Sequence, residues 1–211
     1  MRMLRRNALS FLTFMPIAAA AESAFAAPVA VPEEKPKTAG KILFVVTSHG
    51  ELGNTGRKTG YWLSEVTRPW KVLKDAGYEI DFMSPKGGEC PVEGQNPSDP
   101  VNKAFAQDLS AQKKINFTIK PSEVKPEEYK AIFFAGGHGV MWDFPDNKEL
   151  AAITSKIYEN GGVVAAVCHG PAALINVKLS NGKFLVDGKK INSFTNSEEK
   201  GIGLDKVVPF A

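Results

Sequence analysis

The pattern of apolar and polar residues changes its period several times along this chain. Three short, largely apolar runs predict buried strands at residues 42–47, 130–134 and 163–167, and residues 78–84 (YEIDFMS) predict a further strand. Three longer amphipathic stretches predict helices between them, at residues 61–76, 102–114 and 147–160. Strands that alternate with helices indicate an α/β protein with a doubly wound, mostly parallel sheet sandwiched by helices.

Two segments interrupt this alternation. Residues 86–100 have glycine and proline near their ends and little periodicity, so we expect a loop that could overhang a site. Residues 184–194 (FLVDGKKINSF) place Asp-Gly between two short apolar runs, which predicts a β-hairpin.

The first 26 residues have the pattern of an export signal. Arginines at positions 2, 5 and 6 precede an apolar run from Ala8 to Ala20, and the small residues of AESAFA follow. A retained membrane anchor is the alternative, but the run is shorter than the roughly 20 residues that a spanning helix needs. We therefore predict a signal peptide at 1–26 and a periplasmic or secreted protein. Residues 27–40 are polar and contain proline, which indicates a flexible lead.

The remainder, 41–211, is long enough for one well-filled α/β domain. Removing residues 1–26 takes away three arginines and Glu22, which lowers the formal net charge from +3 to +1. The remaining lysines are scattered rather than clustered, so we expect no nucleic-acid partner, and no membrane partner once the signal is removed.

Candidate chemistry centres on Cys168, which directly follows the strand at 163–167 and precedes Gly170-Pro171. This predicts a sharp strand-to-helix turn, where the positive end of a helix dipole favours a thiolate. Parallel sheets place sites beyond the carboxyl ends of their strands, so His49-Gly50, Gly136–Gly139 and Cys168-His169 are expected to share one crevice. Backbone N–H groups of the glycine pair and of the residue after Cys168 then form a predicted oxyanion hole.

Each candidate also has a plainer interpretation. A buried cysteine is usually a small hydrophobic residue, and His138 could simply cap or pack near the crevice. Trp142 and Phe144 are expected in the core. Glu65 could be an ordinary surface carboxylate, although its apolar neighbours in GYWLSEVTRP favour a protonated carboxyl that donates to a thiolate.

Two further kinds of site are not expected. The three histidines and two cysteines have no zinc-like spacing, so we predict no metal site. Cys90 and Cys168 could pair in an oxidising compartment, but the place of Cys90 in the long loop argues against a disulfide.

Four motifs occur in the order TGYWLSEVTRPW, AIFFAGGHGVMWDFPDN, GGVVAAVCHGPAAL and FTNSEE. They resemble the ThiJ/PfpI superfamily of class I glutamine amidotransferase-like proteins over residues 41–210, and within it the branch of heat-shock chaperones and glutathione-independent glyoxalases (glyoxalase III). The resemblance implies a flavodoxin-like fold with Cys168 as nucleophile, His169 as general acid/base and Glu65 as the acidic partner of the thiol. It implies Glu199 as the carboxylate that orients His169, with Glu198 as the alternative.

The implied reaction converts methylglyoxal, a small dicarbonyl, to lactate without metal or organic cofactor. The oxyanion and substrate contacts are implied at Gly136, Gly137, His138 and His169, and we also expect a homodimer. Protein deglycation, cysteine-dependent amide hydrolysis and a holding chaperone, for which Cys168 is irrelevant, are the alternatives. True glutamine amidotransferase activity is not expected, because the histidine of that class comes from a distant segment. Relatives continue past Ala211 with a further helix and strand, so we expect this chain to be C-terminally truncated.

Overall fold

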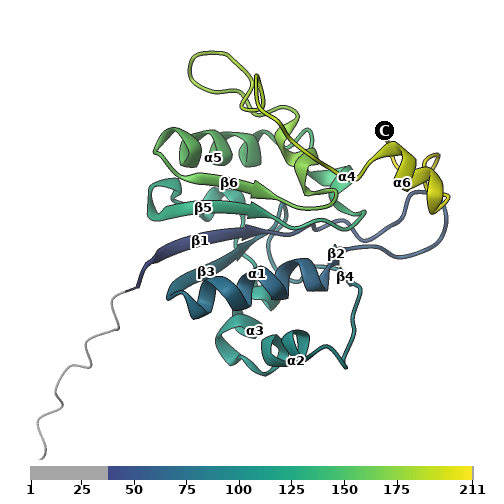
Figure 1. Ribbon diagram of the computed structural model, residues 1–211, viewed down its shortest axis with the longest axis horizontal. Helices are drawn as coiled ribbons and strands as arrows, with labels where there is room; N and C mark the ends of the chain where they lie inside the picture. Colours follow the sequence, from purple (N-terminus) through teal and green to yellow (C-terminus); the bar gives the residue numbers. More distant parts are fainter. Residues whose placement is uncertain (1–37, 211) are drawn as a thin grey trace, which may run out of the picture. The chain divides into compact units, whose positions relative to one another are not determined.

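The computed structural model describes residues 38–210 (Figure 1). The predicted signal peptide, most of the predicted lead and Ala211 lie outside these residues. Within them, four strands form a parallel sheet in the order β3-β1-β5-β6. The strands are β1 (Gly40–Val45), β3 (Tyr78–Met83), β5 (Tyr129–Phe134) and β6 (Val163–Ala166). This order confirms the doubly wound fold predicted from the sequence.

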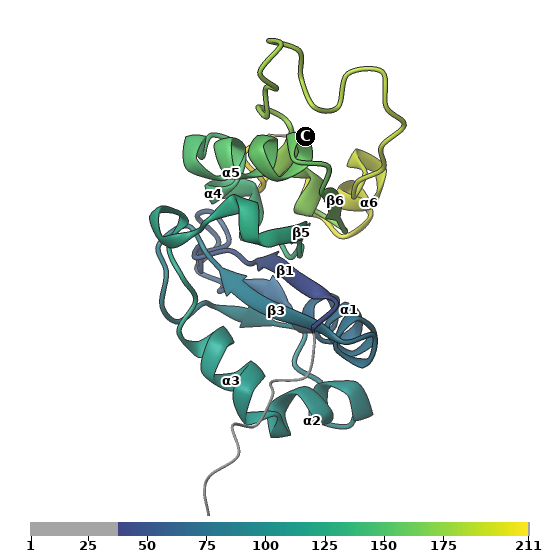
Figure 2. The same cartoon turned by 90° about the vertical axis from the view of Figure 1, so that its left-hand side faces the viewer.

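Helices cover both faces of the sheet (Figures 1 and 2). One face carries α1 (Leu63–Asp75), α2 (Pro100–Gln107) and α3 (Leu109–Asn116). The other carries α5 (Lys148–Glu159), and the short helices α4 (Val140–Asp143) and α6 (Asn196–Gly201) lie beyond the carboxyl ends of the strands. Short 3₁₀ helices span Pro121–Glu123, Pro126–Glu128 and Gly170–Leu174.

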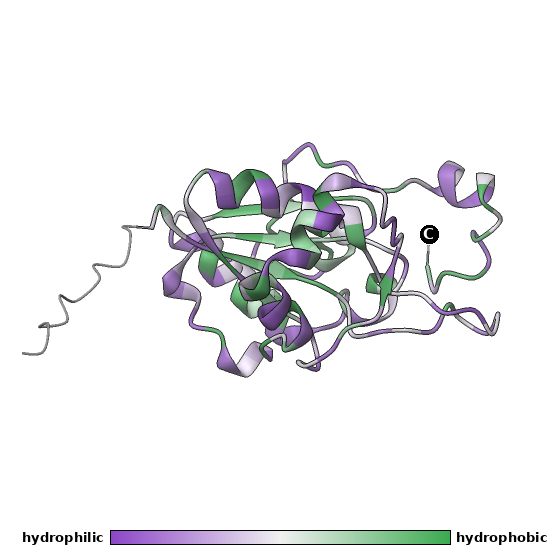
Figure 3. Ribbon diagram, turned by 90° about the horizontal axis from the view of Figure 1, so that it is seen from below, coloured by the Kyte–Doolittle hydropathy of each residue, from purple (hydrophilic) through white to green (hydrophobic). Residues whose placement is uncertain are grey.

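Alternate residues of the central strand serve two separate cores, because successive side chains of a strand point to opposite faces. Leu43 and Val45 of β1 belong to one buried cluster, which includes Leu150 of α5. Phe44 belongs to the other cluster, which includes Trp70 of α1. Figure 3 shows the strands as the hydrophobic layer. Burial on both faces explains why the central strand β1 is an almost continuous apolar run in the sequence.

Two predicted elements differ in detail. The helix predicted at 61–76 begins only at Leu63, because Tyr61–Trp62 forms strand β2 and pairs with β4 (Val92–Glu93). Strand β4 lies within 86–100, so this segment is anchored to the domain rather than being entirely a loop. The helix predicted at 102–114 is divided into α2 and α3 by Asp108, whose side chain accepts a hydrogen bond from the Ala111 N–H at 2.8 Å.

The predicted hairpin at 184–194 is wrong. The Asp-Gly pair does form a turn, with Gly188 at φ 70° and the Lys189 N–H donating to the Val186 carbonyl at 3.0 Å. The residues after this turn pair with no strand in the described structure, and Ile191 is 58% exposed. A two-stranded hairpin is stable only when an apolar face packs against the rest of the domain. With Lys189-Lys190 directly after the turn, this segment presents no such face.

None of the helices within 38–210 combines the length and the apolar character needed to cross a membrane.

Candidate active site

The backbone turns abruptly at Cys168, two residues after β6 ends. Its φ of 57° is the only positive value at a non-glycine residue within 38–210. This left-handed conformation costs roughly 1–2 kcal/mol for an L-residue, and such strain is concentrated at functional sites. The sharp turn expected from the sequence is therefore present. The expected helix after it is only the five-residue 3₁₀ helix Gly170–Leu174, which provides little dipole to stabilise a thiolate.

Gly136, just after β5, lets Cys168 and Glu65 approach each other. A Cβ on this glycine would lie 2.7 Å from the Cys168 Cβ and 2.7 Å from Glu65 Oε2. The Gly136 N–H donates to Glu65 Oε2 at 2.7 Å, which fixes the carboxyl beside the sulfur. This N–H is therefore occupied and is not part of an oxyanion hole, contrary to the expectation from the sequence.

The thiol and the carboxyl form a coupled pair. Burial raises the pKa of Glu65, and burial together with the negative charge of an ionised Glu65 raises the pKa of Cys168. The backbone N–H groups of Gly137 and His169 favour the ionised sulfur and oppose that shift. The expectation that the turn by itself favours a thiolate is therefore wrong. The two buried groups are coupled, so a thiolate at Cys168 is favoured only when the Glu65 carboxyl is protonated.

His169 bridges the sulfur and a second carboxylate. Its Nδ1 lies 3.2 Å from Cys168 Sγ, and its Nε2 lies 2.5 Å from Glu199 Oε1. The ring of Phe194 stacks on the imidazole with a centroid separation of 4.5 Å. Burial lowers the pKa of His169, and the hydrogen bond to Glu199 works against this shift. His169 is thus oriented from both sides and held mainly as the neutral base.

The two neighbouring glutamates of helix α6 point in different directions. Thr195 caps the helix, and the Glu198 carboxylate turns back to accept from the Thr195 N–H at 2.7 Å in a capping box. Glu199 is next in sequence but points inward, is only 4% exposed and contacts His169. Of the two candidates, the geometry therefore selects Glu199.

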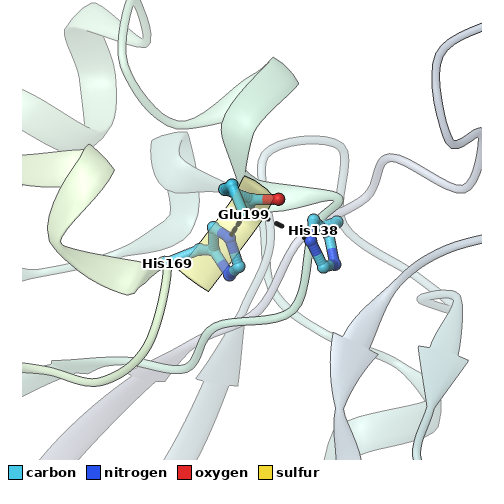
Figure 4. Close-up of side chains that lie close together, drawn as sticks. All are labelled: His138, His169 and Glu199. Carbon is cyan, nitrogen blue, oxygen red and sulfur yellow. Dashed lines mark hydrogen bonds and ion pairs between the residues drawn. The ribbon is translucent and has the colours of Figure 1, made fainter. Parts of the chain in front are cut away.

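His138 approaches the same carboxylate from the other side (Figure 4). Its Nε2 lies 3.2 Å from Glu199 Oε1, outside good hydrogen-bond geometry, and the ring centroids of His138 and His169 are 4.3 Å apart. His138 is thus a neighbour of Glu199 rather than of the Cys168 sulfur. This cluster has no signature in the sequence spacing, because its three members come from separate segments.

The end of β1 reaches this edge of the sheet, but the His49 side chain does not join the cluster. Its ring stacks on Trp142 with a centroid separation of 5.0 Å, and its Nε2 lies 2.6 Å from the Glu51 carbonyl oxygen. Phe144 is buried in the core, as expected. Cys90 and Cys168 are both free thiols.

Sequence reasoning missed Asp143, the acidic residue of the MWDF segment. Its carboxylate accepts hydrogen bonds from the Thr47 hydroxyl and the Ser48 N–H, each at 2.8 Å, and so ties α4 to the end of β1. Burial raises the pKa of Asp143 to about 6. The available signal was that Asp143 is an acidic residue in the segment that follows β5, where parallel sheets place their sites.

The segment around Phe194 also completes the site, although the sequence indicated only a hairpin there. The Phe194 N–H and the Ser193 hydroxyl donate to the Cys168 carbonyl at 2.9 and 3.1 Å. A groove of about 620 Å³ lies beside this segment and is lined in part by Cys168, Val167 and Thr195. Neither Glu65 nor His169 lines this groove, which reaches Cys168 from the side of the segment around Phe194.

Comparison with known proteins places this arrangement in context. The profile of the DJ-1/PfpI family matches residues 58–199. A glutathione-independent glyoxalase of Saccharomyces cerevisiae is 35% identical over 179 residues, covering 80% of this chain and 74% of that protein. Glyoxalase 3 of Candida albicans is 34% identical, with 80% and 74% covered.

Solved structures agree. The Rapid Encystment Protein 24 KDa of Francisella tularensis superposes with a TM-score of 0.77 at 42% identity, covering 82% of this chain and 77% of that one. Glyoxalase III from Candida albicans superposes with a TM-score of 0.72 at 32% identity, covering 80% and 73%. The sequence match and the shared fold together show that the chain belongs to the DJ-1/PfpI family.

Proposed function

We propose that this protein is a glutathione-independent glyoxalase that converts methylglyoxal to lactate through Cys168. The observation that carries the proposal is the continuous contact series Glu65, Cys168, His169 and Glu199. Relatives that are 34–35% identical over four-fifths of this chain are named glyoxalases. An activated thiol beside an oriented imidazole is the arrangement that nucleophilic catalysis requires.

The first step uses the thiol and Glu65. When Glu65 holds the proton of the Cys168 thiol, the thiolate adds to the aldehyde carbon of methylglyoxal and forms a hemithioacetal. The backbone N–H groups of Gly137 and His169 favour negative charge at the sulfur, so they are the groups available to stabilise the new oxyanion.

The second step uses His169 as a base. A neutral imidazole 3.2 Å from the sulfur is close to the carbon bonded to that sulfur, so it can remove the proton from this carbon and return it to the neighbouring one. Electrons move from the first carbon to the second, which leaves a lactoyl thioester. Water then hydrolyses this ester to lactate and restores the thiol. The aldehyde carbon of the substrate is oxidised and the neighbouring ketone carbon is reduced, so the reaction needs no external oxidant or reductant.

The test is methylglyoxal turnover without glutathione, with lactate measured directly. We expect Cys168→Ala to abolish lactate formation, while Cys90→Ala, the matched control at the other free thiol, retains it. Unchanged turnover in Cys168→Ala would refute the proposal. Deglycation and amide hydrolysis use the same sulfur, so parallel assays with glycated amines and simple amides determine whether methylglyoxal is the preferred substrate.

One observation favours a second function, that of a holding chaperone. Large apolar side chains are exposed over the last third of the described chain, at Val163, Ile175, Phe184, Ile191, Ile202 and Phe210. Exposed apolar side chains of this kind can contribute to a surface that binds other proteins. Suppression of client aggregation that survives Cys168→Ala would support this function alongside catalysis.

We also propose, from the sequence, that the protein is exported and that it forms a homodimer. Cell fractionation combined with N-terminal sequencing of the mature protein tests a cleavage after Ala26, and sedimentation of the purified protein tests the dimer.

A further inference from the structure

His138, His169 and Glu199 form a compact set of ligand atoms. One nitrogen from each imidazole and one carboxylate oxygen all lie within 4.8 Å of one another. Figure 4 shows both rings beside Glu199, each directed toward its carboxylate. The contacts run from Glu199 Oε1 to the His169 Nε2 at 2.5 Å and to the His138 Nε2 at 3.2 Å.

The hydrogen-bonding capacity of this cluster is not filled. Glu199 Oε2 and His138 Nε2 are both buried and both lack a hydrogen-bond partner within the described residues. Glu199 is only 4% exposed, so an unpartnered carboxylate oxygen there is costly. A cation held between the Glu199 carboxylate and His138 Nε2 would give both groups a partner.

The donor set fits a divalent transition metal. Two imidazoles and one carboxylate are a common set for zinc and for other divalent transition metals, with a further position open to water. Tetrahedral bonds of about 2.0–2.1 Å separate neighbouring ligand atoms by about 3.3 Å. The distance from Glu199 Oε1 to His138 Nε2, 3.2 Å, is already close to this value. The distance from Glu199 Oε1 to His169 Nε2, 2.5 Å, would have to increase by less than an ångström. A pocket of about 280 Å³ lined by His169 and Glu199 provides access for the ion.

We propose that His138, His169 and Glu199 bind a divalent transition metal ion, and that this ion inhibits the enzyme by capturing His169. The ion coordinates Nε2, the nitrogen that Glu199 now holds, and leaves Nδ1 protonated toward Cys168 Sγ. In that state His169 has no free nitrogen with which to accept a substrate proton. The inhibition depends on the proposed glyoxalase function, whereas the metal binding does not.

The sulfur is the obvious competing ligand, and the geometry separates it from this site. Cys168 Sγ contacts Nδ1, on the opposite side of the imidazole from Glu199. Cys168→Ser therefore distinguishes the two modes of binding. His49→Ala is the matched histidine control, because its ring stacks on Trp142 and is not part of the cluster.

The experiment measures zinc binding to untagged full-length protein by competition with a chromophoric indicator. We expect one tight site per chain, unchanged in Cys168→Ser and in His49→Ala. His138→Ala and Glu199→Gln should each weaken binding by at least about 100-fold, since loss of even an outer-shell partner costs 10–100-fold. Circular dichroism verifies that each variant is folded. In Cys168→Ser, a cobalt(II) spectrum should resemble that of wild type and lack a thiolate charge-transfer band.

The site is refuted if wild type binds no zinc, if His138→Ala and Glu199→Gln, when folded, bind it like wild type, or if Cys168→Ser loses it. On the same preparation, zinc should suppress lactate formation and excess chelator should restore it. Zinc binding with undiminished turnover would overturn the inhibitory role. Absence of lactate formation in metal-free protein would instead contradict the proposed function, and the binding data would still decide the metal site.

Discussion

Replacing Glu199 by glutamine tests the orientation of His169 most directly. The contact between His169 Nε2 and Glu199 Oε1 is 2.5 Å long, and both residues are less than 5% exposed. A hydrogen bond to a charged group is worth about 1.5–3 kcal/mol, so its loss alone should slow the reaction by about 10- to 150-fold. An amide can also hold the imidazole in the wrong tautomer, which in the serine-protease triad costs about 10⁴-fold.

We therefore expect kcat of Glu199→Gln to fall by about 10² to 10⁴, or about 2.7–5.5 kcal/mol in activation free energy, with KM little changed. The pH profile provides a second measurement. Glu199 raises the pKa of His169 against the effect of burial, so its removal lowers that pKa further. The acid limb of kcat/KM, below which His169 is protonated and inactive as a base, should move to lower pH.

Glu198→Gln is the matched control on the same helix. Glutamine also completes a capping box with Thr195, so the free energy of unfolding should change by less than about 0.5 kcal/mol and kcat by less than about threefold. The assay is steady-state lactate formation for wild type and both variants. The reasoning is refuted if Glu199→Gln retains kcat within threefold of wild type, or if Glu198→Gln loses as much activity as Glu199→Gln.

Two further substitutions test other parts of the site. Gly136→Ala should place a methyl group 2.7 Å from both the Cys168 Cβ and Glu65 Oε2. We expect it to lower the free energy of unfolding by about 1–3 kcal/mol, measured by urea denaturation, and to slow alkylation of the Cys168 thiol by iodoacetamide. Alkylation at the wild-type rate would contradict this expectation. Burial raises the pKa of Asp143 to about 6 from 3.8, so its effect on stability is most favourable below about pH 4 and is lost as the pH rises through 6, by roughly 3 kcal/mol. Urea denaturation from pH 4 to 7 should show that Asp143→Asn removes this decline, and equal declines in the two proteins would refute it.

Much of the fold follows from the sequence alone, because strands buried on both faces are read as continuous apolar runs. The strand at 130–134 was recognisable in this way. The helix at 147–160 was recognisable from its amphipathic pattern, and Asn147 caps that helix as its residue type favours. The position of Cys168 at a turn was also legible, because an apolar run ends there before Gly170-Pro171.

Long-range pairing could not be read in the same way. Tyr61–Trp62 looks helical locally but is held as a strand by β4, about thirty residues further on. The Asp-Gly turn at 187–188 looks like a hairpin locally but has no surface on which to pack. In the first place a contact with a distant segment outweighed local preference, and in the second the lack of such a contact left the local preference unsupported.

The protonation and the chemistry of the site were likewise decided by the tertiary structure. The sequence supplied the cysteine, the histidines and the glutamates, but their pKa shifts depend on burial and on partners brought from separate segments. Only the folded chain places Glu65 beside Cys168, directs Glu199 rather than Glu198 inward, and brings His138 to the same carboxylate. The physical reason is that hydrophobic period is a local property of the chain, whereas electrostatic environment is set by whichever segments the fold packs together.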